Sequence, residues 1–179
     1  MRCFLILLVL LFACGNGKVN SNGLTVEETK SVVASNERTI LYFWTSWCSA
    51  SRSVLSRVYR PALDSIRASD LPYRILLVYA SGVKPIDIPE FDSSEFSTLR
   101  HPGTGFPLDD RMEIRAFLIE LLGKEKTNEI LKGKYSFGVP VEIMLDKDLN
   151  VVIPDVPQHT ELLLKALRGE LGEGLSEEE

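Results

Sequence analysis

The sequence predicts a single α/β domain in which helices flank a central mixed β-sheet. Three observations predict this fold class: two buried apolar strands separated by a helical segment, an apolar hairpin near residue 150, and an amphipathic helix after it. The 179 residues, 45% of them hydrophobic, are enough for one domain with a sizeable core. The net charge is −5 and the basic residues are scattered, which excludes a nucleic-acid-binding surface.

Residues 1–13 are predicted to be a secretory signal peptide. One basic residue precedes an apolar run that is shorter than the ~20 residues a membrane-spanning helix needs. The segment "LFAC" resembles a bacterial lipobox, with Leu11 and Ala13 before Cys14, although Phe12 is bulkier than that pattern usually allows. We therefore expect Cys14 to carry a lipid on its sulfur. An ordinary secretion signal without lipid is the alternative.

Polar residues and glycines fill the next segment, so residues 14–24 are predicted to be a tether between the lipid and the domain. A helix is expected to begin at Thr25, because Thr25 and Glu28 have the spacing of a capping box. The folded domain is predicted to span residues 25–170, and the acidic residues 171–179 form a tail.

A strand, a helix and a second strand come first in the domain. Residues 38–46, "RTILYFWTS", are apolar, aromatic and β-branched, as in a buried strand. Residues 49–68 have a helical apolar face, and Pro61 is expected to kink or break this helix. Residues 73–80, "YRILLVYA", are almost uninterrupted in apolar character, which is typical of a strand buried in a parallel sheet. Together they predict a right-handed βαβ unit.

The rest of the domain combines an irregular segment with helices and a hairpin. Residues 81–108 are rich in proline and glycine and are predicted to be a loop or irregular insert. Helices are expected over residues 109–123 and, as a short further turn, over 124–133. Residues 141–153 predict two antiparallel strands around a polar turn, and residues 158–171 predict a closing helix.

Two motifs in this order resemble those of a known family. "FWTSWCSAS" at residues 43–51 resembles the "FWATWCxxC" site of the membrane-tethered thioredoxin-like (TlpA-like) thiol-disulfide oxidoreductases. "FGVP" at 137–140, with "DKDLNVV" behind it, is similar to that family's cis-proline loop and closing hairpin. The resemblance covers about residues 25–170 and implies a thioredoxin-like fold. It also implies a cis peptide bond at Pro140, opposite Cys48, with Val139 beside it offering backbone groups to an extended substrate.

Cys48 is the candidate reactive group. A cysteine at the first turn of a helix faces unpaired backbone N–H groups and the positive end of the helix dipole, and both favour the thiolate nucleophile. Ser51 replaces the second cysteine of the family motif, so a mixed disulfide on Cys48 cannot be released by internal attack. Cys3 leaves with the signal peptide and Cys14 is capped by lipid, which makes Cys48 the remaining thiol.

Neighbouring side chains have both functional and structural interpretations. Trp47 is expected at the surface, where its ring can cover a bound chain, while Trp44 is expected in the core. The Ser51 hydroxyl is a candidate hydrogen-bond donor to the thiolate. Tyr42 occupies the strand position where thioredoxin has a buried acid. Glu142 is either a nearby carboxylate that takes that place or a side chain that points to solvent.

No cofactor and no metal are expected, because the two histidines lie far apart in sequence and form no zinc-binding pattern with Cys48. Three functions remain open. The first is an exported lipoprotein that exchanges disulfides through one thiol, with Cys48 and Ser51 as catalytic residues. The second is a non-catalytic module that holds a partner in the cis-proline groove, and the third is a scaffold for residues 81–108.

The expected partners are extended polypeptides or small thiols, and the lipid is expected to hold the protein at a membrane on the periplasmic side or in the cell envelope. In this scheme Trp47, Val139 and Pro140 bind the substrate.

Overall fold

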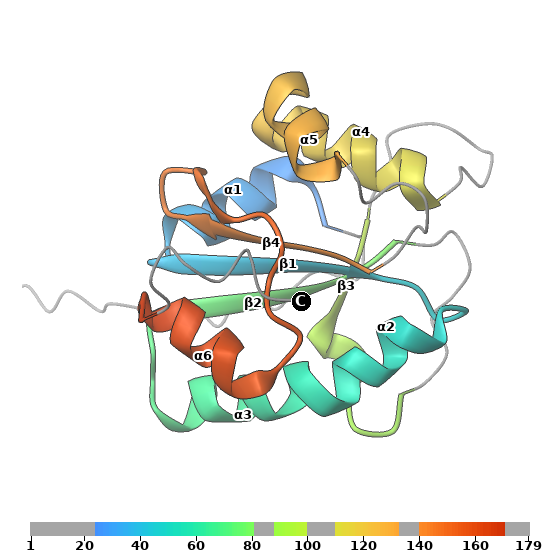
Figure 1. Ribbon diagram of the computed structural model, residues 1–179. Coiled ribbons are helices and arrows are strands. Elements are labelled where there is room, and N and C mark those ends of the chain that lie inside the picture. Colours follow the sequence, from blue (N-terminus) through green and yellow to red (C-terminus); the bar gives the residue numbers. More distant parts are fainter. Residues whose placement is uncertain (1–23, 81–87, 100–109, 133–139, 171–179) are drawn as a thin grey trace, which may run out of the picture.

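The computed structural model describes residues 24–80, 88–99, 110–132 and 140–170 and shows a five-stranded mixed sheet (Figure 1). The strand order is β3-β2-β1-β4-β5. Strands β1, β2 and β3 are mutually parallel, β4 is antiparallel to β1, and β5 is antiparallel to β4. The strands are β1 (Arg38–Trp44), β2 (Tyr73–Tyr79), β3 (Phe96–Thr98), β4 (Val141–Asp146) and β5 (Val151–Ile153).

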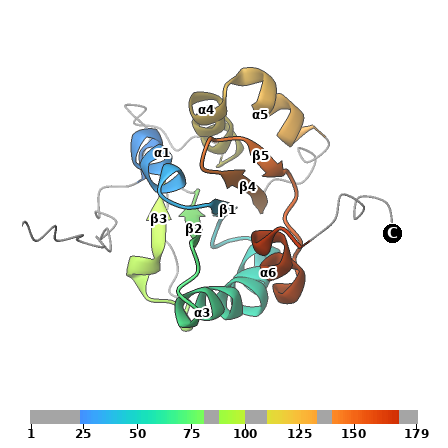
Figure 2. The ribbon, with the colours of Figure 1, turned by 90° about the vertical axis from the view of Figure 1, so that its left-hand side faces the viewer.

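Helices cover both faces of the sheet (Figure 2). One face is covered by α2 (Ser49–Val54), the π-helical turn η1 (Leu55–Tyr59), α3 (Arg60–Ala68) and α6 (Thr160–Arg168). The other is covered by α1 (Val26–Ala34), α4 (Asp110–Leu122) and α5 (Lys124–Leu131). Side chains of β1 alternate between the two cores, with Tyr42 and Trp44 on the first face and Leu41 and Phe43 on the second. Strand β1 is therefore buried on both faces.

The helix between β1 and β2 runs past Pro61 without breaking. The irregularity expected there takes the form of the π turn η1, after which α3 has its proline in the first turn. Pro61 has no N–H to donate to the carbonyl of Arg57, four residues earlier. The hydroxyl of Thr160 at the start of α6 donates to that carbonyl at 3.2 Å instead. The helix irregularity is thus compensated by α6.

The insert is better ordered than the sequence predicts in its described part, residues 88–99. The expectation of loop or irregular structure was wrong for Phe96–Thr98, which form β3 and pair with β2. Phe96 packs against Trp44 with ring centroids 4.7 Å apart. This contact stabilises β3, which has only three residues and is too short to predict as a strand from the sequence. Glu95 fastens the segment to α3, because it pairs with Arg60 at 3.0 Å and Arg67 at 2.7 Å.

Several helix and turn predictions are confirmed. Thr25 and Glu28 form the capping box of α1. Gly123, with a φ of 88°, separates α4 from α5. The hairpin β4–β5 turns at Asp146, whose carboxylate accepts hydrogen bonds from the backbone N–H groups of Asp148 and Asn150.

The predicted fold class is confirmed. A parallel pair joined by a helix, then an antiparallel hairpin on the other side of β1 and a final helix, is the thioredoxin-like arrangement. The predicted signal peptide, the tether before Leu24 and the acidic tail lie outside the described residues. Leu24, assigned to the tether, is instead buried and bridges Leu99.

Candidate functional site

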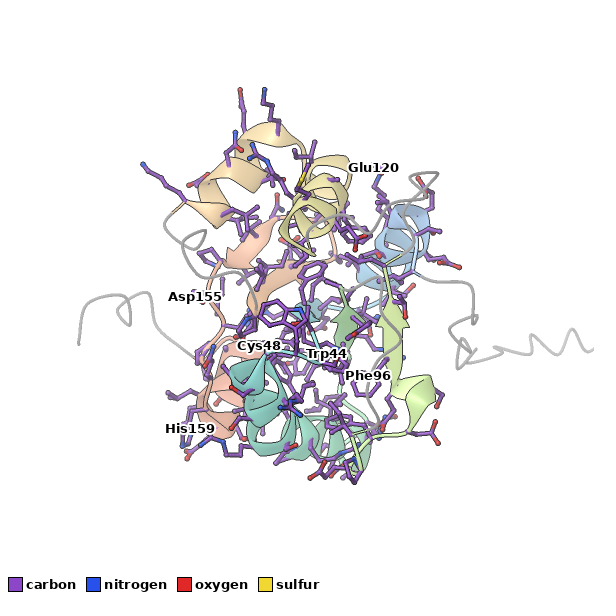
Figure 3. The ribbon with its side chains drawn as sticks, turned by 90° about the vertical axis from the view of Figure 1, so that its right-hand side faces the viewer. Trp44, Cys48, Phe96, Glu120, Asp155 and His159 are labelled. Carbon is purple, nitrogen blue, oxygen red and sulfur yellow. The ribbon has the colours of Figure 1, made fainter. Side chains whose placement is uncertain are left out.

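Cys48 lies where β1 gives way to the first helix, as expected from the sequence. Residues 45–47 turn away from the end of β1, and Cys48 is the N-cap of α2 with φ −84° and ψ 110°. Its Sγ accepts a hydrogen bond from the backbone N–H of Ser51 at 3.5 Å, and the side chain is half-buried. Figure 3 shows Cys48 at the start of α2, with Trp44 and Phe96 beyond it toward the sheet. The sulfur is therefore held by a backbone N–H while it remains open to solvent on one side.

The two tryptophans around the site differ in exposure. Trp44 is completely buried, whereas Trp47 is 62% exposed. Trp44 packs edge-on against Tyr79 with ring centroids 4.8 Å apart, and the Tyr79 hydroxyl is 2.9 Å from that of Ser46. These contacts anchor the turn that precedes Cys48, while Trp47 offers an amphipathic ring to the solvent beside the sulfur.

Ser51 faces the interior. Its side chain is completely buried, and its Oγ has no hydrogen-bond partner among the described residues. The expectation that this hydroxyl donates to Cys48 was wrong, since the backbone N–H of Ser51 makes that contact. The Ser51 carbonyl accepts a hydrogen bond from the hydroxyl of Tyr42 at 2.9 Å, which ties the first turn of α2 to β1. The side chain at the position of the second cysteine of the family motif is therefore enclosed by the protein.

A buried carboxylate lies on the strand next to Tyr42. Glu142 is 2% exposed and stands directly across from Tyr42 in the β1–β4 ladder, so the alternative that it points to solvent was wrong. The Oε1 of Glu142 accepts a hydrogen bond from the Nε2 of Gln158 at 3.3 Å. The ring of Tyr42 also contacts that of Tyr59, with centroids 4.3 Å apart. Two phenols and one carboxylate thus share the core beneath α2.

This cluster has clear electrostatic consequences. Burial raises the pKa of Tyr42 far above its ordinary value, and the negative charge of Glu142 raises it further. Burial and Glu142 raise the pKa of Tyr59 in the same way. Both phenols therefore stay protonated at neutral pH, so Tyr42 remains a hydrogen-bond donor to the turn that carries the site.

Tyr59 and Gln158 were not singled out from the sequence. Tyr59 belongs to the apolar face of its helix, which gives no hint of the π turn that aims it at Tyr42. Gln158 comes just before a predicted helix, and no local pattern pairs it with a strand residue. Only the packing of α6 against the crossover helix brings it there.

Pro140 directly precedes β4 and is half-buried. Because Val141 pairs with Phe43, the ladder continues with Pro140 opposite Trp44, four residues before Cys48. The sequence-predicted proline and cysteine are thus at the same end of the sheet. Val139, which precedes the proline, and Cys14 lie outside the described residues.

Within the described ranges, no cluster of three or more histidine, cysteine or acidic side chains could hold a metal ion. Nor does any helix in those ranges have both the length and the apolar character that crossing a bilayer demands.

The chain matches no family model and no curated protein, but it resembles solved structures. One is the exposed lipoprotein thioredoxin Etrx1 of Streptococcus pneumoniae, at 18% identity and a TM-score of 0.43, covering 82% of this chain and 96% of that one. StoA of Bacillus subtilis is 15% identical with a TM-score of 0.39, over 74% and 83%. A thiol:disulfide interchange protein from Bacteroides sp. is 10% identical with a TM-score of 0.42, over 87% and 90%.

Proposed function

We propose that this chain is an exported lipoprotein whose thioredoxin-like domain exchanges disulfides through the single thiol of Cys48. The observation that carries the proposal is the position of Cys48: an N-cap whose sulfur accepts a backbone N–H, beside the exposed ring of Trp47. A thiolate formed there keeps one face open to an incoming disulfide. Backbone N–H groups at the helix start stabilise its negative charge.

The reaction begins with attack of the Cys48 thiolate on one sulfur of a substrate disulfide. A new S–S bond joins Cys48 to that sulfur, and the second substrate sulfur leaves as a thiolate. No electrons are gained or lost overall in this exchange. The released substrate thiolate can attack another disulfide of the substrate, which forms a new pairing and frees a different thiolate. When that thiolate attacks the substrate sulfur bound to Cys48, a substrate disulfide forms and Cys48 leaves as the free thiolate.

Ser51 determines how the intermediate is resolved. A serine hydroxyl cannot form a disulfide, and this one is buried with its backbone bound to Cys48 and Tyr42. A mixed disulfide on Cys48 therefore waits for an outside thiol, either the substrate's or a small thiol such as glutathione. This favours disulfide isomerisation and the removal of small-thiol caps over net dithiol reduction.

The alternative is a binding module that holds an extended partner without turnover. The buried serine at position 51 favours it, because the chain retains the shape of the site without the second thiol. In that case the sulfur of Cys48 contributes little, and the Trp47 ring and the backbone near Pro140 hold the partner. Strand addition of an extended peptide beside Pro140 would supply the hydrogen bonds.

One experiment separates the two functions. The wild type, Cys48→Ser and Trp47→Ala are compared for reactivation of a scrambled-disulfide protein in a glutathione buffer, and for binding of a cysteine-free unfolded chain. Exchange predicts reactivation by the wild type that Cys48→Ser abolishes. A binding module predicts no reactivation by any of the three and binding that only Trp47→Ala weakens. Ala50→Ser, an exposed change in the same helical turn, serves as the matched control.

A further inference from the structure

The chain enters the domain at the end of the sheet that carries Cys48. Leu24 forms a parallel bridge with Leu99, and its N–H donates to the carbonyl of Thr98 at 2.6 Å. Leu99 follows β3 and donates to Tyr79, and Ala80 follows β2 and donates to Trp44. Leu24 therefore belongs to a row that crosses the sheet through Leu99 and Ala80 and ends at residue 45.

The four paired residues in this row determine the distance between Leu24, where the chain enters the domain, and the turn that carries Cys48. Three inter-strand steps of about 4.8 Å separate Leu24 from Thr45, which places them roughly 14 Å apart. Thr45 is only three residues before Cys48. In Figure 1, α2 and α4 both begin at the right-hand side, at the end of β1 that leads to Cys48.

The length of chain before Leu24 limits the distance to the proposed anchor. If Cys14 carries the lipid, the ten residue steps from Cys14 to Leu24 span at most about 35 Å. Cys48 can then lie no more than about 60 Å from the bilayer surface, from about 35 Å of tether, about 14 Å across the sheet and about 10 Å between Thr45 and Cys48. The hairpin turn at Asp148 lies at the other end of β1, beyond Arg38, and is about 20 Å farther along the strand.

Exposed apolar side chains favour the same orientation. Among the described residues, four large hydrophobic side chains are substantially exposed, and the two most exposed are Trp47 at 62% and Met112 at 59%. Trp47 directly precedes α2, and Met112 belongs to the first turn of α4, so both lie on elements that begin at the site end. Tryptophan in particular is enriched at membrane–water interfaces.

We propose that the Cys48 end of the domain faces the membrane and that its partners are membrane-anchored polypeptides whose cysteines lie close to the bilayer surface. This inference rests on the proposed lipid anchor and on thiol exchange at Cys48. Because the tether is short and enters the domain beside Cys48, the effective concentration of Cys48 is high only near the bilayer surface. Disulfides at that surface are therefore favoured as substrates.

The first test measures orientation without any chemistry at Cys48. Full-length lipidated Cys48→Ser protein in phospholipid vesicles receives a fluorescent donor at Ala50→Cys or at Asp148→Cys, two exposed positions at opposite ends of β1. With acceptor dyes on the lipid headgroups, we expect at least about twofold more energy transfer from position 50, given the ~20 Å between the two ends. Equal transfer, greater transfer from position 148, or failure of the protein to bind the vesicles overturns the inference.

The second test uses the wild-type protein and two membrane-spanning peptides that each carry one activated disulfide. In one peptide the disulfide is about 10 Å from the bilayer, three extended residues away. In the other it is about 90 Å away, on a 60-residue helical spacer. We expect at least tenfold faster adduct formation with the near disulfide, since the effective concentration falls sharply where a linker cannot span the distance.

Insertion of thirty glycine and serine residues after Asn22 is the control and should abolish this preference. Equal rates for the two peptides in the unextended protein would overturn the inference, even if the same protein reacts normally with a soluble disulfide. Absence of reaction with any disulfide would instead overturn the thiol-exchange function, while the energy-transfer result would still decide the orientation.

Discussion

Restoring the missing cysteine gives the sharpest test of the site. Ser51→Cys places a second thiol one helical turn after Cys48, in a completely buried position. Residues three apart on a helix have their Cα atoms about 5 Å apart, within the about 4.4–6.8 Å between Cα atoms that a disulfide tolerates. The Sγ of Cys48 already leans toward this turn, because the N–H of Ser51 contacts it at 3.5 Å. We expect the two sulfurs to bridge without backbone rearrangement.

The magnitude follows from loop closure and from burial. A disulfide that closes a loop of four residues stabilises the folded state by about 2 kcal/mol in the chain-entropy treatment. For a domain of this size, 2 kcal/mol corresponds to a rise in melting temperature of about 4–8 °C on oxidation. The reduced variant also loses a buried hydroxyl that has no partner among the described residues, so we expect it to be at least as stable as the wild type.

The assay has two readouts. Thermal unfolding with and without a reductant measures the stabilisation by the disulfide, and reduction of an insulin disulfide measures dithiol activity. We expect Ser51→Cys to show both, while long-lived mixed disulfides with glutathione, detected by mass spectrometry, become short-lived. The wild type should accumulate those adducts. Ser51→Ala is the matched control, because it removes the same hydroxyl and supplies no thiol.

Two results would refute the reasoning. One is a folded Ser51→Cys protein in which Cys48 and the new thiol stay reduced under oxidising conditions. The other is a bridged protein that neither reduces insulin nor shortens the glutathione adducts. Either result would mean that Cys48 is a residual side chain in a scaffold.

Three further predictions concern the framework of the site. Tyr42→Phe removes the 2.9 Å hydrogen bond to the Ser51 carbonyl and should lower stability by about 1 kcal/mol in urea unfolding; unchanged stability would contradict a role in anchoring α2. Glu95→Gln should destabilise by about 2 kcal/mol at pH 7, because two arginines bind that carboxylate. Burial alone would raise the pKa of Glu95, but hydrogen bonds from Arg60 and Arg67 lower the pKa below the ordinary value for glutamate. The stabilisation by the Glu95 carboxylate is therefore complete at pH values above the ordinary pKa of a glutamate, and it is lost as the pH falls through the lowered pKa of Glu95. The stabilities of the wild type and the variant should converge in acid unfolding. A difference in stability that persists at acidic pH would refute the ion pair as its source. Gly169→Ala should cost about 1–2 kcal/mol in thermal unfolding, since φ is 73° and a Cβ would lie 2.7 Å from Arg38; a neutral effect would show that the end of α6 can shift.

Local pattern alone was enough to predict the main elements and the place of Cys48. The strand at 38–44 is apolar on both faces because both faces are covered, and such a run predicts a buried strand in any context. The capping box at Thr25 is a contact between residues three apart, so it too needs no tertiary information. A cysteine between a strand and a helix start is likewise visible in the order of the residues.

Side-chain orientation in strands covered on both faces could not be predicted in this way. Glu142 was equally compatible with solvent or core, because β4 is buried along its length and its pattern marks no polar face. The burial of this carboxylate depends on residues of other elements: Gln158, before α6, donates a hydrogen bond to it, and Tyr59 of η1 is near enough for the charge of Glu142 to raise its pKa. The same holds for β3, whose three residues become a strand only because β2 and the Trp44 ring are there to receive them.

The place of the chain entry was also decided by tertiary structure. Composition indicates a tether before Leu24, yet it contains no information about which end of the sheet the tether joins. That depends on one backbone hydrogen bond from Leu24 to Thr98, between residues more than seventy positions apart. Backbone donors and acceptors are the same in every residue, so long-range pairing of this kind leaves no mark in the sequence and is selected only when the whole sheet assembles.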